Sequence, residues 1–286
     1  MSLKLRIQDH LLTAIRASIE AGRSILAIYS SDFDAEMKGD RTPLTLADKR
    51  SHAIIARRLQ ETGFPILSEE GRKISYEERK GWNLFWIVDP LDGTKEFIKR
   101  NGEFTVNIAL IEARKPILGV IFVPVQDILY FAFQGLGSFK LPCGGSKADL
   151  DELSFEKIMA LSLRLPLPPS PPSPFALTHQ SDDVSRPFII IGSRSHATPE
   201  LMAFVENKRK ECGKVTLISA GSSLKFCLVA EGKADMYPRL GPTMEWDTAA
   251  GQAIAENAGR KVLVWGGKEP LRYNRLDLLN PWFIVL

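Results

Sequence analysis

A short apolar run that leads directly into two carboxylates is the feature that most constrains the fold of this chain. Phe85–Val88 contains no polar residue, and the segment Asp89–Thr94, with the sequence DPLDGT, follows it at once. An uninterrupted apolar run is typical of a strand buried on both faces, because a strand with one wet face alternates apolar and polar residues. The sequence therefore predicts a buried strand that delivers a carboxylate at its tip.

The rest of the chain alternates helices and strands, with no internal repeat. Helical spacing of apolar residues and helix-end signals predict helices over about 6–30, 46–62, 95–99, 199–210, 221–230 and 247–258. Short apolar runs predict strands over 64–68, 85–88, 105–112, 119–123, 128–133, 188–192, 215–218, 234–237, 261–265 and 282–286, with turns at 114–116 and 124–127. This alternation predicts an α/β or α+β fold built in layers.

The segment 141–187 differs in composition from the rest of the chain. It is rich in serine and above all in proline, including the run Pro166–Pro174. Such composition is typical of an extended loop, because proline can neither continue a helix nor donate to a sheet. We therefore expect 141–187 to be a loop or insertion that separates an N-terminal half, 1–140, from a C-terminal half, 188–286.

Composition excludes several classes of function. With 286 residues, 44% hydrophobic and 25% charged, the chain can bury a sizeable core. Its net charge is only +3 and its basic residues form no block, so we expect no nucleic-acid partner. Three cysteines are too few, and odd in number, for a disulfide framework.

Its location is predicted from what the sequence lacks. The polar start, Met1–Arg6, does not resemble a secretory signal. The most apolar stretches, such as Ile117–Val125, fall far short of the ~20 residues that span a membrane. We expect a cytoplasmic protein with no integral membrane segment, and leave peripheral association with the inner membrane open.

The segment Asp89–Thr94 has the chemistry of a magnesium site. A turn there brings the carboxylates of Asp89 and Asp92 and the carbonyl of Leu91 toward one point, and Mg²⁺ prefers such oxygen ligands. Gly93 and Thr94 open a predicted helix, whose free N–H groups suit a phosphate. An ordinary helix start with an Asp cap explains these residues equally well.

Three other carboxylate positions fit such a site, and each also has an ordinary explanation. Glu69, with Glu70 beside it, follows an apolar run, although adjacent carboxylates on a turn are usually solvated. Asp247 is expected to start a helix, where capping alone accounts for it. Asp48 is expected to be an acidic residue near a helix start.

Taken together, these segments form an ordered pattern. It runs Thr-x-x-Asp at 45–48, Glu-Glu-Gly at 69–71, Asp-Pro-Leu-Asp-Gly-Thr at 89–94 and Trp-Asp-x-Ala-Ala-Gly at 246–251. The pattern resembles the lithium-sensitive, magnesium-dependent phosphatase superfamily of inositol monophosphatase over roughly 38–259. The resemblance implies a layered sandwich of alternating αβαβα layers, two or three Mg²⁺ ions and inhibition by Li⁺.

The resemblance also implies roles for particular residues. The implied metal ligands are Glu69, Asp89, Asp92, Asp247 and the Leu91 carbonyl, most of them in the half 1–140. Thr94 and Asp48 would orient and polarise the attacking water, and the amides of Gly93 and Thr94 would hold the phosphoryl oxygens. Lys38 matches a basic residue in a family loop that helps to hold one metal.

The half 188–286 resembles the CysQ-type 3′(2′),5′-bisphosphate nucleotidases of this superfamily, through Ser193–His196 and Gly221–Phe226. This likeness implies removal of the 3′-phosphate from adenosine 3′,5′-bisphosphate, a nucleotide by-product of sulfate assimilation, to give AMP and phosphate. The implied contacts to the uncleaved phosphate come from Ser222, Lys225 and Arg239, with His196 near the nucleoside. Ordinary explanations stay open: a snorkelling lysine, a turn arginine and a cap histidine.

Two rival functions remain at this point. An inositol monophosphatase or related sugar phosphatase places an acidic residue seven positions before the Trp-Asp aspartate, and here that position is Leu240. A non-catalytic module that senses nucleotides would have no use for a water-activating Thr–Asp pair. The preference between the bisphosphate and its sulfated analogue, and the oligomeric state, stay open.

Overall fold

The structure is a computed structural model that describes residues 3–31, 42–142, 154–167, 186–194 and 198–286. Within these ranges the largest unit is a seven-stranded sheet with the order β1-β2-β3-β4-β5-β6-β7. β1 is parallel to β2, and each later neighbour is antiparallel. Its strands are β1 Ile66–Ser68, β2 Leu84–Asp92, β3 Thr105–Glu112, β4 Lys115–Val123, β5 Ile128–Phe133, β6 Gly137–Pro142 and β7 Leu163–Arg164.

Two smaller sheets come from the C-terminal half. In one, β8 (Phe188–Ser193) is parallel to β9 (Val215–Ala220). The other has the order β10-β12-β11, with β10 Tyr237–Arg239, β11 Val262–Val264 and β12 Phe283–Val285. The helices of the described residues are α1 Leu3–Tyr29, α2 Pro43–Gln60, α3 Tyr76–Arg79, α4 Thr94–Ile98, α5 Phe155–Leu161, α6 Pro199–Cys212, α7 Leu224–Glu231 and α8 Glu245–Asn257.

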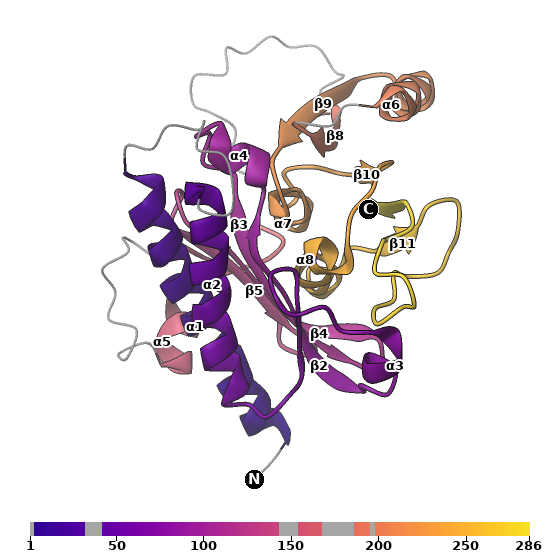
Figure 1. Ribbon diagram of the computed structural model, residues 1–286. Coiled ribbons are helices and arrows are strands. Elements are labelled where there is room, and N and C mark those ends of the chain that lie inside the picture. The colour runs from indigo at the N-terminus through magenta and orange to yellow at the C-terminus, as the bar shows by residue number, and fades with distance from the viewer. Residues whose placement is uncertain (1–2, 32–41, 143–153, 168–185, 195–197) are drawn as a thin grey trace.

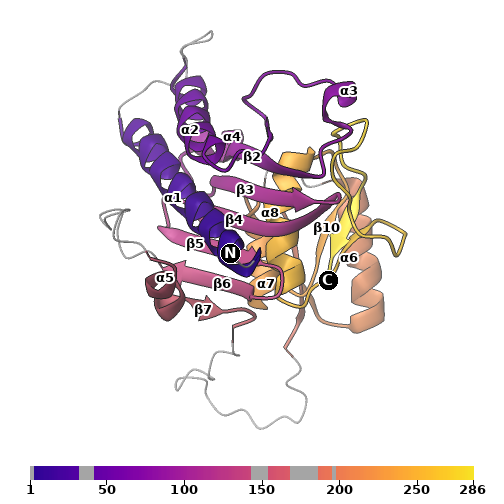
Figure 2. The same cartoon turned by 90° about the horizontal axis from the view of Figure 1, so that it is seen from below.

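Helices and sheets stack in alternating layers, which Figures 1 and 2 show from two directions. α1, α2 and α5 cover one face of the large sheet, and α7 and α8 cover the other. The small sheets lie beyond α7 and α8, and α6 packs on β8 and β9 as the outermost layer. The predicted αβαβα sandwich is therefore confirmed.

The alternation of side chains along β3 explains why both faces of the sheet are covered. Val106, Ile108 and Leu110 pack in the core under α1 and α2, whereas Ala109 and Ile111 pack under α7 and α8. Successive side chains of a strand point to opposite faces, so a strand with apolar side chains on both faces needs helices on both sides.

A close approach between α8 and β4 fixes the second helical layer. A Cβ atom added at Gly119 in β4 would lie 2.5 Å from the carbonyl oxygen of Ala250 in α8. Only glycine leaves room for a helix backbone at that distance. The packing holds α8 firmly against the sheet and so fixes the helix that carries Asp247.

The structure differs from the predicted elements in several places: α3 was not predicted, α7 begins at Leu224 instead of 221, and β10 lies at Tyr237–Arg239 instead of 234–237. β2 extends through Asp92, with a register shift after Asp89, so the first carboxylate lies inside the strand and the second ends it. β4 begins at Lys115, because Ala113 and Arg114 adopt the positive φ angles that turn the chain. The described part of 141–187 contains the end of β6, α5 and β7, so it is more regular than the proline content suggested.

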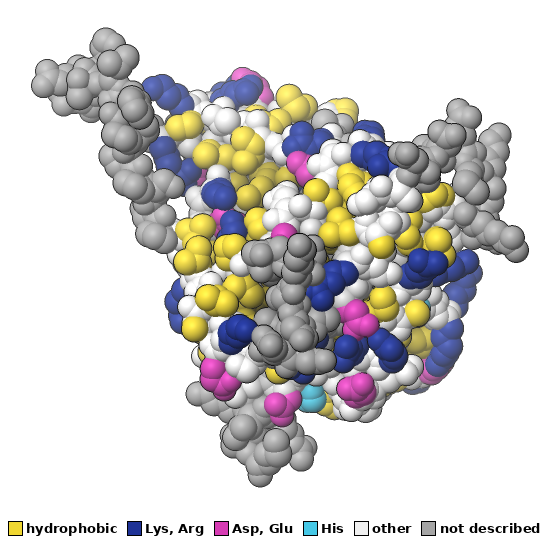
Figure 3. Space-filling model, turned by 90° about the vertical axis from the view of Figure 1, so that its left-hand side faces the viewer, with side chains coloured by type: hydrophobic (Ala, Val, Ile, Leu, Met, Phe, Trp, Pro, Cys, Tyr) yellow, Lys and Arg dark blue, Asp and Glu magenta, His cyan; other side chains and the backbone are white. Residues whose placement is uncertain are grey.

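One side of the molecule, over α1 and α2, shows Lys and Arg side chains scattered among apolar ones rather than gathered into one patch (Figure 3). Glu20 of α1 accepts hydrogen bonds from Arg57 and Arg58 of α2, which joins the two helices. Of the described helices, none combines the length and the apolarity that crossing a membrane requires.

Candidate active site

A cavity of about 260 Å³ opens where the end of β2 meets the starts of α4, α7 and α8. It collects residues that lie far apart in the sequence. Its predicted site residues are Asp92, Gly93, Thr94, Ser222, Lys225, Arg239 and Asp247. The structure thus brings the aspartates of two segments together with Lys225 and Arg239, the two side chains predicted to bind the second phosphate.

The end of β2 is held in its irregular path by one bond from α2 and one local bond. Ser51 of α2 donates to the carbonyl oxygen of Pro90 at 2.7 Å, and the Leu91 N–H donates to Asp89 Oδ1 at 3.1 Å. Gly93 has a φ of 100°, which L side chains rarely adopt. These contacts end the strand at Asp92 and start α4 at Thr94.

Asp92 is fixed by two polar residues that the sequence analysis did not identify. Ser223 Oγ lies 2.7 Å from Asp92 Oδ2 and 2.8 Å from the carbonyl oxygen of Asp247. Asn107 Nδ2 donates to Asp92 Oδ2 at 3.2 Å and to Ser223 Oγ at 2.9 Å. The signal for Asn107 was present in the sequence, since it is the one amide side chain in a strand whose other residues from Val106 to Ile111 are apolar.

The acidic residues around this cavity raise each other's pKa. Burial, followed by the charge of Asp92, raises the pKa of Asp247 to about 7. Burial, followed by the charges of Glu70 and Glu69, raises the pKa of Asp48 to about 8. Loss of water and the charge of Asp92 also raise the pKa of Glu69, although the residue is exposed.

The two carboxyls of the DPLDGT segment are affected in the same way. Burial and then the charges of Asp92, Glu69, Asp247 and Asp48 raise the pKa of Asp89 well above its usual range. Burial also raises the pKa of Asp92, although bonds from Ser223 and the charge of Lys225 oppose the shift. Carboxyls that raise each other's pKa lie close enough to repel one another when ionised.

This donor set suits a hard cation such as Mg²⁺. Four carboxyls and the carbonyl of Leu91 are oxygen donors, and a bound cation would remove the repulsion among them. Among the described residues, no three His, Cys, Asp or Glu side chains stand close enough together to hold a metal ion as they are placed. The fit therefore rests on donor chemistry and charge.

Lys225 is a buried cation that lines the cavity. It is only 4% exposed, so the alternative of a snorkelling surface lysine is wrong. Its Nζ donates to the carbonyl oxygens of Ala220 and Ser222 and lies 5.5 Å from the centre of the Tyr237 ring. Burial lowers its pKa to about 8, against the opposing charge of Asp92.

Arg239 lies in β10 rather than in the turn that was the alternative explanation. One terminal nitrogen donates to the carbonyl oxygen of Pro242 at 2.7 Å, while its Nε is buried without a hydrogen-bond partner. A buried donor without a partner costs free energy, and a movement of the guanidinium toward an anion in the cavity would relieve it.

An ion pair between the two halves holds the loop before α7. Arg194 makes two hydrogen bonds of 2.7 Å to the Glu103 carboxylate, which also accepts from the Gly221 N–H at 2.7 Å. Ser222 Oγ donates to the carbonyl oxygen of Glu103, so this hydroxyl is already engaged. The pair thereby fixes the backbone that precedes Ser223 and Lys225.

The remaining predicted site residues are placed as follows. Asp247 is the third residue of α8, and its Oδ2 accepts from the Met244 N–H at 2.8 Å, so it does cap the helix start. Asp48 lies inside α2 rather than in its first turn, and no hydrogen bond joins its described side chain to Thr94. Lys38 and His196 fall outside the described residues.

Comparisons with known proteins agree with this architecture. The model of the Inositol monophosphatase family matches residues 7–284. The chain is 43% identical over 270 residues to the 3′(2′),5′-bisphosphate nucleotidase CysQ of Shigella flexneri, covering 93% of this chain and 94% of the relative. It is 33% identical to the nucleotidase CysQ of Haemophilus influenzae over 288 residues, covering 99% of this chain and 94% of the relative.

Solved structures give the same result. The crystal structure of CysQ from Bacteroides thetaiotaomicron, a bacterial member of the inositol monophosphatase family, matches with a TM-score of 0.89 at 50% identity, covering 98% of both chains. An inositol monophosphatase from Zymomonas mobilis matches with a TM-score of 0.68 at 21% identity, covering 97% of this chain and 92% of that chain. The second likeness concerns the fold alone.

Proposed function

The chain belongs to the inositol monophosphatase family, and on that premise we propose that it is a Mg²⁺-dependent phosphatase that converts adenosine 3′,5′-bisphosphate to AMP and phosphate. One observation carries the proposal: a single cavity is lined by Asp92 and Asp247 and also by Lys225 and Arg239. A substrate with two phosphates needs a metal site for the phosphate that is cut and cations for the one that is kept. The nucleotidases among its relatives support this choice.

The metal would be held beside the cavity, where Asp92 and Asp247 line it. The proposed ligands are the predicted set of Glu69, Asp89, Asp92, Asp247 and the Leu91 carbonyl. Bound Mg²⁺ supplies positive charge that acidifies water and stabilises phosphoryl oxygens. We propose two or three ions, and inhibition by Li⁺ as in the family pattern described above.

The chain's own residues would position and deprotonate the water. Thr94 lies at the first position of α4 and lines the cavity together with Gly93, so its hydroxyl and the N–H groups of both residues would bind the substrate phosphate. Asp48, with a pKa near 8, is able to hold a proton taken through the Thr94 hydroxyl. These two side chains would form their hydrogen bond in the substrate complex.

The second phosphate would bind at Lys225 and Arg239. The buried Lys225 ammonium and the unpartnered Arg239 Nε would both gain an anionic acceptor. Ser222 would contribute its hydroxyl only after releasing the carbonyl oxygen of Glu103. His196 is proposed to lie near the nucleoside.

The rival functions are less well supported. Leu240 is buried, so it offers no acceptor for the hydroxyl groups of inositol. A nucleotide-sensing module would not need a buried, mutually repelling set of carboxyls, which is unfavourable unless a cation is bound. We also propose a cytoplasmic location and a nucleotide as the small-molecule partner.

Phosphate release from adenosine 3′,5′-bisphosphate and from inositol 1-phosphate, measured side by side with Mg²⁺, tests the proposal. We expect the bisphosphate to be hydrolysed with the higher kcat/KM. Faster turnover of the inositol ester would overturn the nucleotidase assignment. Micromolar nucleotide binding without hydrolysis would favour the sensing module.

Substituting Ser223 by Ala is expected to weaken the apparent Mg²⁺ affinity about tenfold to a hundredfold. The reason is that Ser223 orients both Asp92 and the backbone of Asp247. The Mg²⁺ concentration for half-maximal activity measures the effect. Ser138→Ala is the matched control, because Ser138 is equally buried but its hydroxyl has no partner. The same Mg²⁺ requirement in both variants would show that Ser223 has no part in metal binding.

Mg²⁺ is expected to stabilise the protein more at about pH 8 than at about pH 6. Asp48 and Asp247 have pKa values of about 8 and about 7 in the folded state, against 3.8 ordinarily. The folded state therefore binds protons more tightly, so stability falls as pH rises toward 8. A cation at the carboxyls replaces those protons.

The midpoint of thermal unfolding, with EDTA and with Mg²⁺, measures this difference. We expect Mg²⁺ to raise it by roughly 5 °C at the higher pH and by less at the lower. KCl of equal ionic strength is the control. An equal Mg²⁺ shift at both pH values would contradict the proposed site.

A further inference from the structure

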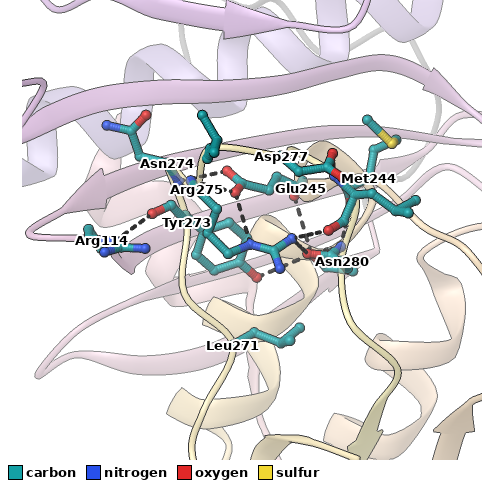
Figure 4. Close-up of polar contacts among 12 residues, drawn as sticks. Arg114, Met244, Glu245, Leu271, Tyr273, Asn274, Arg275, Asp277 and Asn280 are labelled. Atoms are coloured by element: carbon teal, nitrogen blue, oxygen red, sulfur yellow. Dashed lines mark hydrogen bonds and ion pairs between the residues drawn. The ribbon is translucent and has the colours of Figure 1, made fainter. Parts of the chain in front are cut away.

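The start of α8 is held from outside the cavity by a buried polar cluster. Its partners lie in residues 271–280 of the loop between β11 and β12, which we name the clamp segment (Figure 4). Glu245 is fully buried, and its carboxylate accepts from the N–H groups of Asn274 at 2.7 Å and Arg275 at 3.0 Å. Arg275 Nε adds a contact of 3.3 Å, so the buried charge is paired.

Asn280 holds residues on both sides of Asp247. Its Nδ2 donates to the carbonyl oxygen of Met244 at 2.6 Å and lies 3.0 Å from Thr248 Oγ1. Its own N–H donates to the carbonyl oxygen of Thr243 at 2.7 Å. Asn280 thus ties the backbone on one side of Asp247 to a side chain on the other.

The clamp segment is itself anchored to the large sheet and to α3. Asn274 exchanges two hydrogen bonds with Arg79, at 2.8 Å to its guanidinium and 2.7 Å to its carbonyl oxygen. Tyr273 and Arg114 are joined by two further bonds, of 3.1 and 3.2 Å, each to a Tyr273 backbone group. The clamp segment therefore connects the start of α8 to α3 and to the turn between β3 and β4.

This geometry reaches the cavity through Asp247 and through its neighbours Thr243 and Thr248. Thr243, Asp247 and Thr248 line the cavity, whereas Glu245 and Asn280 are not among its lining residues. Asp247 takes its orientation from the Met244 N–H, and Asn280 fixes the carbonyl oxygen of that same Met244. A shift of the helix start would move the Asp247 carboxylate with it.

We propose that Glu245 and Asn280 are positioning residues that set the Asp247 carboxylate for metal binding. The inference rests on the proposed function, in which Asp247 is a metal ligand. A buried charge with three donors contributes little net stability to a fold, since well-packed apolar residues of similar size stabilise it as much. It is an effective way to fix one helix start, because each partner has a defined direction.

Calorimetric titration with Mg²⁺ tests the proposal without depending on catalysis. In Glu245→Gln the new NH₂ group replaces an oxygen that accepted a hydrogen bond from a backbone N–H. Two donors then face each other, so the helix start must shift. We expect Mg²⁺ affinity to fall about tenfold. Glu231→Gln is the matched control, since Glu231 is also fully buried and paired, to Lys140 and Lys233, and lies at the far end of α7.

The outcomes separate this inference from the proposed function. Unchanged Mg²⁺ affinity in Glu245→Gln, with normal binding to the wild type, would overturn the inference and leave the metal site intact. Absence of Mg²⁺ binding to the wild type would overturn the metal site, and the inference with it. If Glu245→Gln does not fold, Asn280→Ser gives a second test, because it removes the Nδ2 bonds to Thr243, Met244 and Thr248. The backbone donors to Glu245 are kept in that variant. An equal loss in Glu231→Gln would show a general effect of stability and also overturn the inference.

Discussion

Asp92→Asn is expected to lower Mg²⁺-dependent phosphate release by about a hundredfold to a thousandfold. Asp92 ends β2, lines the cavity and receives hydrogen bonds from Ser223 and Asn107. The amide oxygen of Asn would accept the same bonds, so the fold is preserved. What is lost is the negative charge that would hold the cation.

The same variant is expected to be no less stable than the wild type without Mg²⁺. Asp92 contributes to the raised pKa values of Asp89, Glu69 and Asp247, so removing its charge relieves repulsion. Thermal unfolding in EDTA measures this. Glu112→Gln is the control, since Glu112 is an exposed carboxylate paired in register with Leu84 at the opposite end of β2. Full Mg²⁺-dependent activity in Asp92→Asn would show that the metal is bound elsewhere.

Lys225→Met is expected to lower kcat/KM for adenosine 3′,5′-bisphosphate about tenfold to a hundredfold, the equivalent of one charged hydrogen bond. Activity on adenosine 3′-monophosphate should fall much less, because that substrate lacks the second phosphate. Methionine keeps the unbranched shape that packs against the Tyr237 ring. Steady-state kinetics on the two substrates measures the difference.

The pH dependence of KM gives a second measure of the same group. Since burial holds the Lys225 pKa near 8, the free enzyme loses this charge as pH rises through that value. KM for the bisphosphate should therefore rise above about pH 8 in the wild type and not in Lys225→Met. Lys140→Met is the control, because Lys140 pairs with Glu231 and does not line the cavity. Equal losses on both substrates would assign Lys225 a structural role.

Continuous apolar runs made much of the fold predictable. β3 and β5 have the predicted bounds, and α1 and α2 differ from theirs by only a few residues. The elements that were missed are the one-turn helix α3 and the elements β6, α5 and β7, and the last three lie in or beside the proline-rich segment. In this segment, pairing with the sheet outweighs local composition. A sequence pattern carries no information about such tertiary pairing.

The site was predictable only where the chemistry is local. The DPLDGT turn and the Trp-Asp helix start carry their own signals, and the cavity contains Asp92 and Asp247 from them. Ser223 and the clamp residue Asn280 act through bonds to residues far away in the sequence, so no sequence spacing predicts their roles. The burial of Lys225 likewise depends on how α7 packs.

A crystal structure with AMP, phosphate and Mg²⁺ is the most direct test of the central claim that one cavity serves both phosphates. The products are not consumed, so the complex reports where each group binds. The account predicts the AMP 5′-phosphate within hydrogen-bond distance of Lys225 or Arg239, and free phosphate with Mg²⁺ at Asp92 and Asp247. AMP bound with its 5′-phosphate at the aspartates, or outside this cavity, would contradict it.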